Sequence, residues 1–302
     1  MPKSTCTQLL SLLLVLLCSC LTAGAQRICV DGIHYGLIGT RLAYVVCPDL
    51  TPGAPAAYKG EVTIPATISY GNRTYTVFTV GESAFAGCDE LTAVHLPTTV
   101  SAISACAFIG CQQLQEVSHP QGLQAIGSSA FVGCTSLRQL PLARKAEVID
   151  TLTYNCCAAM PAAVISRNVR HIRCGAFVHC NALRHLYCFT EALPEVDADA
   201  FSANIMAQAT LHVPSAIIAS CAAHPILSRF AKIEPLTDAD YQACGYRKGD
   251  INDDGLIDSQ DLQLLRRLIV SLPVSVAHLW SADLNADGKV NAQDFVLLLQ
   301  QL

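Results

Sequence analysis

Charged residues are scarce in this chain of 302 residues, where they make up 14%. The 19 Lys and Arg residues are outnumbered by 24 Asp and Glu residues, which gives a net charge of −5. Without a basic excess to neutralise phosphates, the composition is not typical of nucleic-acid-binding proteins. Apolar residues nevertheless make up 52% of the chain, which predicts folded domains with a core rather than a disordered tail.

Long apolar runs are also few. The longest, Leu9–Leu21, is shorter than the ~20 residues that a membrane-spanning helix needs, so we expect no membrane span. This run follows Lys3 and precedes Ala23-Gly24-Ala25, a cleavage pattern that predicts a signal peptide over residues 1–25. An alternative interpretation takes Leu17–Cys20 as a bacterial lipobox with a lipid anchor on Cys20. Both predict a protein that is secreted, extracellular or on the bacterial cell surface.

Catalytic and zinc-binding motifs are absent as well. The sequence contains no HExxH, GxSxG, GxxxxGK[ST] or GxGxxG motif, and its nine histidines are scattered. None of the 16 cysteines forms a CxxC pair, which argues against a zinc site. The sequence therefore does not predict an enzyme.

What the sequence does contain is a 23-residue repeat. Cysteine recurs at this step, an aromatic residue recurs three positions before it, and a large aliphatic residue recurs three positions after it. The cysteine column is Cys88, Cys111, Cys134, Cys157 and Cys180; the aromatic column is Phe85, Phe108, Phe131, Tyr154 and Phe177; the aliphatic column is Leu91, Leu114, Leu137, Met160 and Leu183. One unit cannot bury such a face alone, so stacked units are expected to form a solenoid with a partial sixth coil at Ala200-Phe201. The column cysteines are interpreted as small buried residues rather than as disulfides.

The segments Ser83–Leu91, Cys106–Cys111 and Ser129–Cys134 resemble the BspA-type (Treponema pallidum-type) leucine-rich repeat. This resemblance implies a leucine-rich-repeat solenoid, and in that family the repeats occur in bacterial surface and secreted proteins linked to adhesion. We assign residues 26–76 to a strand-rich N-terminal cap, because short apolar runs there are broken by Pro and Gly. Residues 77–236 are assigned to the repeats with their C-terminal cap, and 237–247 to a linker.

The C-terminal segment carries two acidic loops of one pattern, the first beginning at Asp250 and the second at Asp283. Side-chain oxygens recur at positions 1, 3, 5, 9 and 12, with glycine at position 6 and a carbonyl at position 7, which suits a hard cation such as calcium. The predicted ligands are Asp250, Asn252, Asp254, Leu256 (carbonyl), Asp258 and Asp261 in one loop, and Asp283, Asn285, Asp287, Lys289 (carbonyl), Asn291 and Asp294 in the other. Position 12 carries Asp where an EF-hand has Glu. Two calcium ions are expected.

An amphipathic run follows each loop, and residues 248–302 as a whole resemble the type I dockerin, which docks onto cohesin modules. Carried over from that family, the partner-binding positions are Ser259, Gln260, Arg266 and Arg267. A solvated helix face explains the same residues equally well. The expected fold class is therefore α+β, with a capped leucine-rich-repeat solenoid followed by a small α-helical calcium-binding module.

Two hypotheses about function remain. In the first, the solenoid binds a protein or glycan, through outward positions that include Arg138, Arg184, His185 and Tyr187, and the dockerin-like end tethers it to a cohesin-like partner. In the second, the chain is a non-catalytic or cryptically catalytic component of an extracellular polysaccharide-degrading complex.

Overall fold

The computed structural model describes residues 26–48, 58–118, 120, 122–139, 141, 143–270 and 279–302. The predicted signal peptide and the alternative lipid anchor at Cys20 lie outside these residues. The described residues form two compact units, one within residues 1–234 and the other within residues 235–302. Within the described ranges, no helix combines the length and the apolar character needed to cross a membrane.

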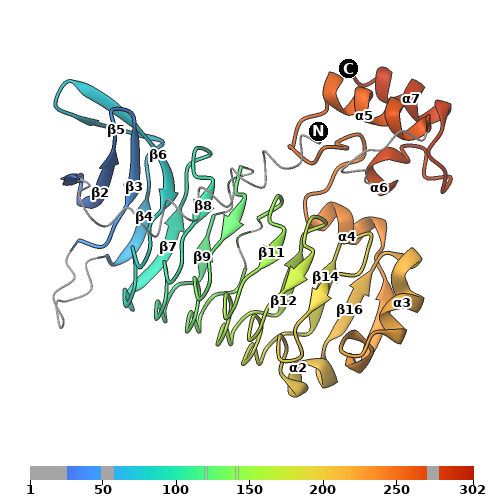
Figure 1. Cartoon of the computed structure of the whole chain (residues 1–302), viewed down its shortest axis with the longest axis horizontal. Coiled ribbons are helices and arrows are strands. Elements are labelled where there is room, and N and C mark those ends of the chain that lie inside the picture. The colour runs from blue at the N-terminus through green and yellow to red at the C-terminus, as the bar shows by residue number, and fades with distance from the viewer. Residues whose placement is uncertain are drawn as a thin grey trace. The chain divides into compact units, whose positions relative to one another are not determined.

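The first unit begins with a strand-rich cap, as the sequence predicts. Strands β1 (Gln26–Val30), β2 (Ile33–Ile38) and β3 (Leu42–Val45) form an antiparallel meander. Strand β3 then pairs in parallel with β6 (Arg73–Val80), which also forms a hairpin with β5 (Thr67–Tyr70). Because β6 pairs in parallel with β8 (Ala102–Ile103), the cap covers the first coil and continues into the solenoid (Figure 1).

The solenoid carries short parallel strands on two faces (Figure 1). On one face β8 pairs with β10 (Ala125–Ile126), and β11 (Val148–Ile149), β13 (His171–Ile172) and β15 (Glu195–Val196) continue the same columns. The other face holds two sheets. One has the order β4 (Gly60–Thr63), β7 (Leu91–His95), β9 (Glu116–Val117), and the second has the order β12 (Ala162–Ile165), β14 (His185–Cys188), β16 (Thr210–Val213), β17 (Lys232–Pro235).

The predicted aromatic column is a continuous stack of rings inside the solenoid. Phe85, Phe108 and Phe131 are fully buried, and their ring centroids lie 5.0 and 5.1 Å apart with nearly parallel planes. The stack passes through Tyr154 and Phe177 to the Phe201 ring of the partial sixth coil. Each coil contributes one ring to a core that a single coil could not form alone. The stacked rings therefore set how neighbouring coils align.

The cysteine column has a structural role. All thirteen cysteines in the described ranges are free thiols. Each thiol from Cys111 onward in the column donates a hydrogen bond to the carbonyl of the aromatic residue one coil earlier; Cys134 Sγ, for example, lies 3.1 Å from the Phe108 oxygen. Burial raises the pKa of Cys134 and of Cys180 to about 12. These thiols therefore remain protonated and satisfy a carbonyl inside each turn, rather than acting as nucleophiles.

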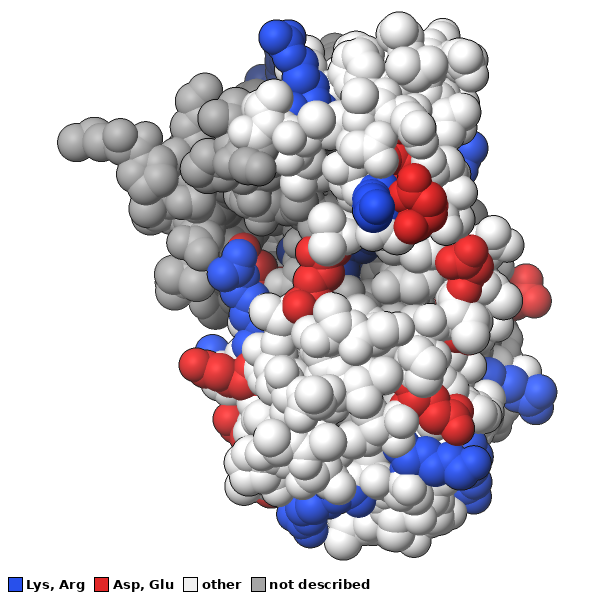
Figure 2. Space-filling model, turned by 90° about the vertical axis from the view of Figure 1, so that its right-hand side faces the viewer, with Lys and Arg blue, Asp and Glu red and all other residues white. Residues whose placement is uncertain are grey.

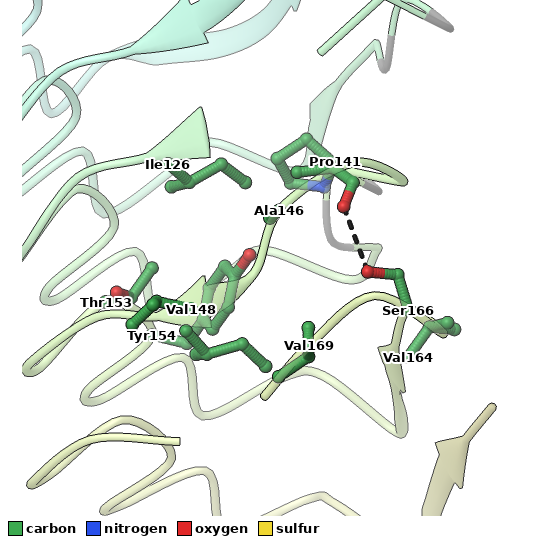
Figure 3. Close-up of a pocket in the computed structure, with 11 residues that line it drawn as sticks. Ile126, Pro141, Ala146, Val148, Thr153, Tyr154, Val164, Ser166 and Val169 are labelled. Atoms are coloured by element: carbon green, nitrogen blue, oxygen red, sulfur yellow. Dashed lines mark hydrogen bonds between the residues drawn. The ribbon is translucent and has the colours of Figure 1, made fainter. Parts of the chain in front are cut away.

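The fourth coil is packed less tightly than its neighbours. Ala146 stands where Val77, Val100, Leu123 and Val169 fill the corresponding position of the other coils, and Thr153 stands where alanine recurs. A cavity of about 20 Å³ remains beside these two residues (Figure 3). Its other lining residues are Ile126, Pro141, Ala143, Val148, Ile149, Tyr154, Val164, Ser166 and Val169. This space is smaller than a ligand site, so we interpret it as a packing defect.

Helices close the C-terminal end of the first unit. Helix α2 (Ala203–Gln208) is followed by the short 3₁₀ helix η1 (Ser215–Ile217), helix α3 (Ile218–Ala223) and the 3₁₀ helix η2 (Leu227–Arg229). Phe230 ends the aromatic column by meeting the Phe201 ring edge-on at 5.3 Å. These elements cover the last coil, as terminal caps of repeat proteins do.

The second unit is helical. Helices α5 (Ser259–Ile269) and α7 (Ala292–Leu299) pack around Ile251, Leu265 and Leu298, and the single turn α6 (Leu279–Ala282) precedes the second acidic loop. The segment that the sequence assigns to a linker, 237–247, contains helix α4 (Asp238–Ala243). Its Tyr241 stacks on Trp280 with ring centroids 4.3 Å apart, and Trp280 Nε1 donates to Asp238 at 2.7 Å. Residues 237–247 therefore form part of the second unit.

Candidate functional site

In the first acidic loop, side-chain oxygens accept hydrogen bonds from backbone N–H groups of the same loop. Both Asp250 oxygens accept backbone N–H groups, from Asp254 at 3.1 Å and from Gly255 at 3.0 Å. The Asn252 side-chain oxygen accepts a second bond from the Asp254 N–H at 2.9 Å, and Asp254 in turn accepts the Leu256 N–H. The left-handed backbone at Gly255, with φ of 86°, makes the turn that brings these groups together. The polar side chains of the loop are thus turned inward.

The second loop repeats this arrangement bond for bond. Asp283 accepts from the N–H groups of Asp287 and Gly288 at 3.1 and 3.0 Å, and Asn285 accepts from Asp287 at 3.0 Å. Its glycine, Gly288, has φ of 80°. Two separate segments of the chain therefore fold to the same local geometry, which a chance polar turn does not explain.

The aspartate at position 12 closes each loop onto the following helix. Asp261 is fully buried, and its two oxygens accept from Ile251 at 2.7 Å, Asn252 at 3.0 Å and Asp258 at 2.9 Å. Asp294 makes the equivalent three bonds in the second copy. The same carboxylates complete capping boxes at the starts of α5 and α7, whose N-cap residues are Asp258 and Asn291. The shorter side chain thus joins the two ends of the loop, a role that the sequence does not reveal.

Negative charge is concentrated inside the first loop. Burial, together with the nearby carboxylates of Asp253 and Asp261, raises the pKa of Asp250 to about 6. The direction of this shift shows that the ionised form is disfavoured when no cation balances it. A divalent cation in the loop would offset this repulsion.

The donors in both loops fit calcium. Asp, Asn and backbone carbonyls supply only oxygen, which hard cations prefer. In the part of the chain that the structure describes, no three His, Cys, Asp or Glu side chains converge closely enough to hold a metal by themselves. The ligands that the sequence predicts also include the uncharged amide oxygens of Asn252 and Asn285 and the carbonyls of Leu256 and Lys289.

The partner-binding positions predicted beside the first loop are all exposed on α5. Ser259 and Gln260 lie in its first turn, and Arg266 and Arg267 lie in its last turn. At the equivalent positions of the second copy, the arginines are replaced by Leu299 and Gln300. The two helices therefore present different chemistry behind similar loops.

Of the four solenoid residues that we predict to bind a ligand, three lie close together and Arg138 lies apart from them. His185 and Tyr187 lie on β14, and Arg184 immediately precedes that strand and is exposed. Arg138 is also exposed, but it lies two coils earlier in a segment without regular secondary structure rather than on a strand. The Arg184 guanidinium donates to the carbonyls of Asn181 and Leu183, each at 3.0 Å, and so is held by its own turn.

A residue that the sequence does not single out, His212, joins this face. Its ring stacks on Tyr187 with centroids 4.6 Å apart, and its Nε2 lies 3.1 Å from His185 Nδ1. The only sequence signal for it is the alternation in Leu211-His212-Val213, which places this histidine on the outward side of a strand.

Surface charge is sparse, as the composition predicts. On the face drawn in Figure 2, basic and acidic side chains are scattered among uncharged residues, with no broad basic patch.

Comparison with protein families finds a match for the repeats and another for the C-terminal segment with the acidic loops. Residues 78–207 match the family described as the BspA type leucine rich repeat region, in six copies. Residues 248–302 match the type I dockerin domain. No curated protein matches the sequence.

The chain is also similar to solved structures of bacterial leucine-rich-repeat proteins. A leucine rich cell surface protein from Faecalibacterium prausnitzii is 21% identical, with a TM-score of 0.51, and the match covers 64% of this chain and 55% of that one. The chain thus spans about half the length of that protein. The T. pallidum leucine rich repeat protein is 22% identical, with a TM-score of 0.48 and coverage of 73% and 97%.

Proposed function

Because the chain combines a BspA-type leucine-rich repeat region with a type I dockerin domain, we propose that it is a secreted or cell-surface recognition protein without catalytic activity. Its solenoid would bind a protein or glycan, and its dockerin domain would attach it to a cohesin-bearing partner. Type I dockerin domains generally bind calcium, and dockerin domains bind cohesins. The observation that carries the proposal is the pair of loops with matching hydrogen bonds, because both gather the oxygen donors that a hard cation prefers.

Two calcium ions are proposed, one in each loop. Asp250, Asn252, Asp254, Asp258, Asp261 and the Leu256 carbonyl would hold the first; Asp283, Asn285, Asp287, Asn291, Asp294 and the Lys289 carbonyl would hold the second. Bound calcium would supply positive charge where the carboxylates crowd. Because the core of this unit is small, that binding energy becomes folding energy.

The stoichiometry can be measured on the full chain by calorimetric titration with calcium after chelation. Two ions are expected for the parent, and about one for Asp250→Ala and for Asp283→Ala. The matched control is Asp253→Ala, because the second loop already carries alanine at that position, Ala286. A parent protein that takes up no calcium would overturn this part of the proposal.

Folding of the two units can be followed separately. Trp280 is the only tryptophan and lies in the second unit, stacked on Tyr241. Adding a chelator should therefore shift its fluorescence toward that of a solvent-exposed indole. Far-UV circular dichroism should keep the strand signal of the repeats, which contain neither loop.

Attachment to the partner is the second test. We propose that Ser259, Gln260, Arg266 and Arg267 on α5 contact the cohesin-like protein. Pull-downs from the secreted and surface fraction of the producing cells should recover that protein only with calcium, and Arg266→Ala/Arg267→Ala should weaken recovery. Gln208→Ala, an exposed change on α2 of the repeat unit, should not. Recovery that is insensitive to both calcium and the arginines would contradict the tether.

Ligand binding by the solenoid is proposed on Arg138, Arg184, His185 and Tyr187. The first three are exposed and Tyr187 is half-buried, and the ring contact between His185 and Tyr187, with centroids 6.0 Å apart, favours one recognition surface. Replacing all four by alanine should reduce attachment to matrix proteins or to glycans on an array. Unchanged attachment would place the ligand on another face.

A further inference from the structure

Two histidines on the outer face of the solenoid have ring nitrogens within hydrogen-bond distance of each other. His185 lies on β14 and His212 on β16, and these strands pair in parallel with His185 opposite Thr210 and Tyr187 opposite His212. The two histidines are therefore diagonal neighbours on one face of the sheet. Their nitrogens, Nδ1 of His185 and Nε2 of His212, are 3.1 Å apart.

This separation suits two ligands of one metal ion. Zinc is bound by imidazole nitrogen at about 2.0–2.1 Å. An ion at that distance from both nitrogens would make an N–metal–N angle of about 100°, between the tetrahedral and square-planar values. The hydrogen-bonded pair thus already has the spacing that a shared metal ion requires.

The surroundings hold both rings in place and leave the site open. Tyr187 stacks on the His212 ring, and its centroid also lies 6.0 Å from that of His185. His185 is exposed and His212 half-buried, so water can complete the coordination. The nearby Arg184 guanidinium is hydrogen-bonded to carbonyls of its own turn, which keeps this cation directed at the backbone.

We propose that His185 and His212 form a binding site for one divalent transition-metal ion of the kind that imidazole prefers, such as Zn²⁺ or Cu²⁺. Metal binding requires unprotonated Nδ1 on His185 and unprotonated Nε2 on His212. The proton shared between these atoms moves to the outer nitrogen of its own ring, so two neutral imidazoles lose no proton. The remaining positions are filled by water or by a donor from a bound partner.

This site is chemically separate from the acidic loops. Calcium prefers oxygen donors, and the histidine pair offers nitrogen. Saturating calcium therefore fills the loops without occupying the histidine pair, and the two kinds of site can be titrated independently.

The test is a titration of the full chain with zinc chloride in excess calcium. Accessible thiols such as Cys29 are first alkylated, because thiolates also bind zinc. We expect one site with micromolar affinity, weakened at least tenfold in His185→Ala and in His212→Ala. The matched control is His179→Asn, which removes an exposed histidine outside the pair and keeps a residue that tolerates its left-handed backbone, with φ of 62°.

A second readout identifies the ligands directly. With Cu²⁺ in place of zinc, electron paramagnetic resonance should show coupling to two nitrogens in the parent and to fewer in either histidine variant. Circular dichroism should be unchanged in both variants, since both rings lie on the outer face of the sheet. Zinc affinity that is equal in the parent and the two histidine variants, or uptake that alkylation alone abolishes, would overturn the site.

Discussion

The cavity in the fourth coil allows the packing argument to be tested with one substitution, Ala146→Val. Every other coil carries Val or Leu at this position, and the cavity beside Ala146 is about 20 Å³. Burying one added CH₂-sized group is worth about 0.8 kcal/mol. Two added carbons would give up to ~1.6 kcal/mol, but Thr153 occupies part of the space, so we expect a gain in the free energy of unfolding of about 1 kcal/mol.

Urea unfolding in saturating calcium, followed by far-UV circular dichroism, measures this gain in the repeat unit. Trp280 fluorescence, which reports the second unit, should show the same midpoint as the parent. The matched control is Ala107→Val. Ala107 is fully buried and does not line the cavity, so the same two carbons should cost ~1–3 kcal/mol there. If Ala146→Val destabilises the repeats as much as Ala107→Val does, the cavity does not provide the space we assign to it.

Three further predictions concern the repeats. Phe131→Ala should cost ~3–5 kcal/mol in the same urea assay because it removes a fully buried ring from the middle of the stack, whereas Gln139→Ala, at an exposed site, should stay within about 0.5 kcal/mol. Cys156→Gly should stabilise by about 1 kcal/mol, because Cys156 has φ of 64° where three earlier coils carry glycine; Gly133→Ala should show the opposite sign. Alkaline pH should destabilise the repeats. Burial raises the pKa of Cys134 in the folded protein to about 12, whereas the unfolded chain releases this proton above about pH 9. Between pH 9 and 12, the free energy of unfolding should therefore fall by about 1.4 kcal/mol per pH unit for each such thiol. Cys134→Ala should make this pH dependence less steep.

The solenoid could be predicted because the residue types that form its core recur at a constant spacing along the sequence. A 23-residue unit that occurs five times fixes which side chains stack, and the ring stack and the thiol-to-carbonyl bonds follow from that register. The departures from the period could not be predicted. One repeat step from Tyr187 leads to Thr210, whereas the structure pairs Tyr187 with His212. Helix α2 lies in this last coil and its extra residues shift the register, so the histidine pair is visible only in three dimensions.

The acidic loops could be predicted for a different reason. All the predicted ligands of one loop lie close together along the chain, so local sequence determines the geometry of that loop. Helix α4 shows the limit of that reasoning. Thr237 and Asp240 form a capping box that is detectable in the sequence, but the stacking of Tyr241 on Trp280 joins two segments that are distant in the sequence. Contacts of that kind have no local signal, and so the sequence alone suggests a linker there.

The two copies within residues 248–302 share their loop geometry but differ on the helices that follow the loops. The loops match in every bond described above, yet Gln263 and Arg266 on α5 correspond to Val296 and Leu299 on α7, which are 52% and 54% exposed. In one orientation, a group on the partner would pair with Arg266. In the reversed orientation, the same group would face Leu299, and leaving a charged or polar group unpaired at an interface is costly. We therefore expect one docking orientation. Arg266→Leu/Arg267→Gln, which copies α7 onto α5, should weaken partner binding measured by calorimetry, whereas Leu299→Arg/Gln300→Arg should leave it unchanged. Equal losses from both exchanges would mean that the partner contacts the two helices alike.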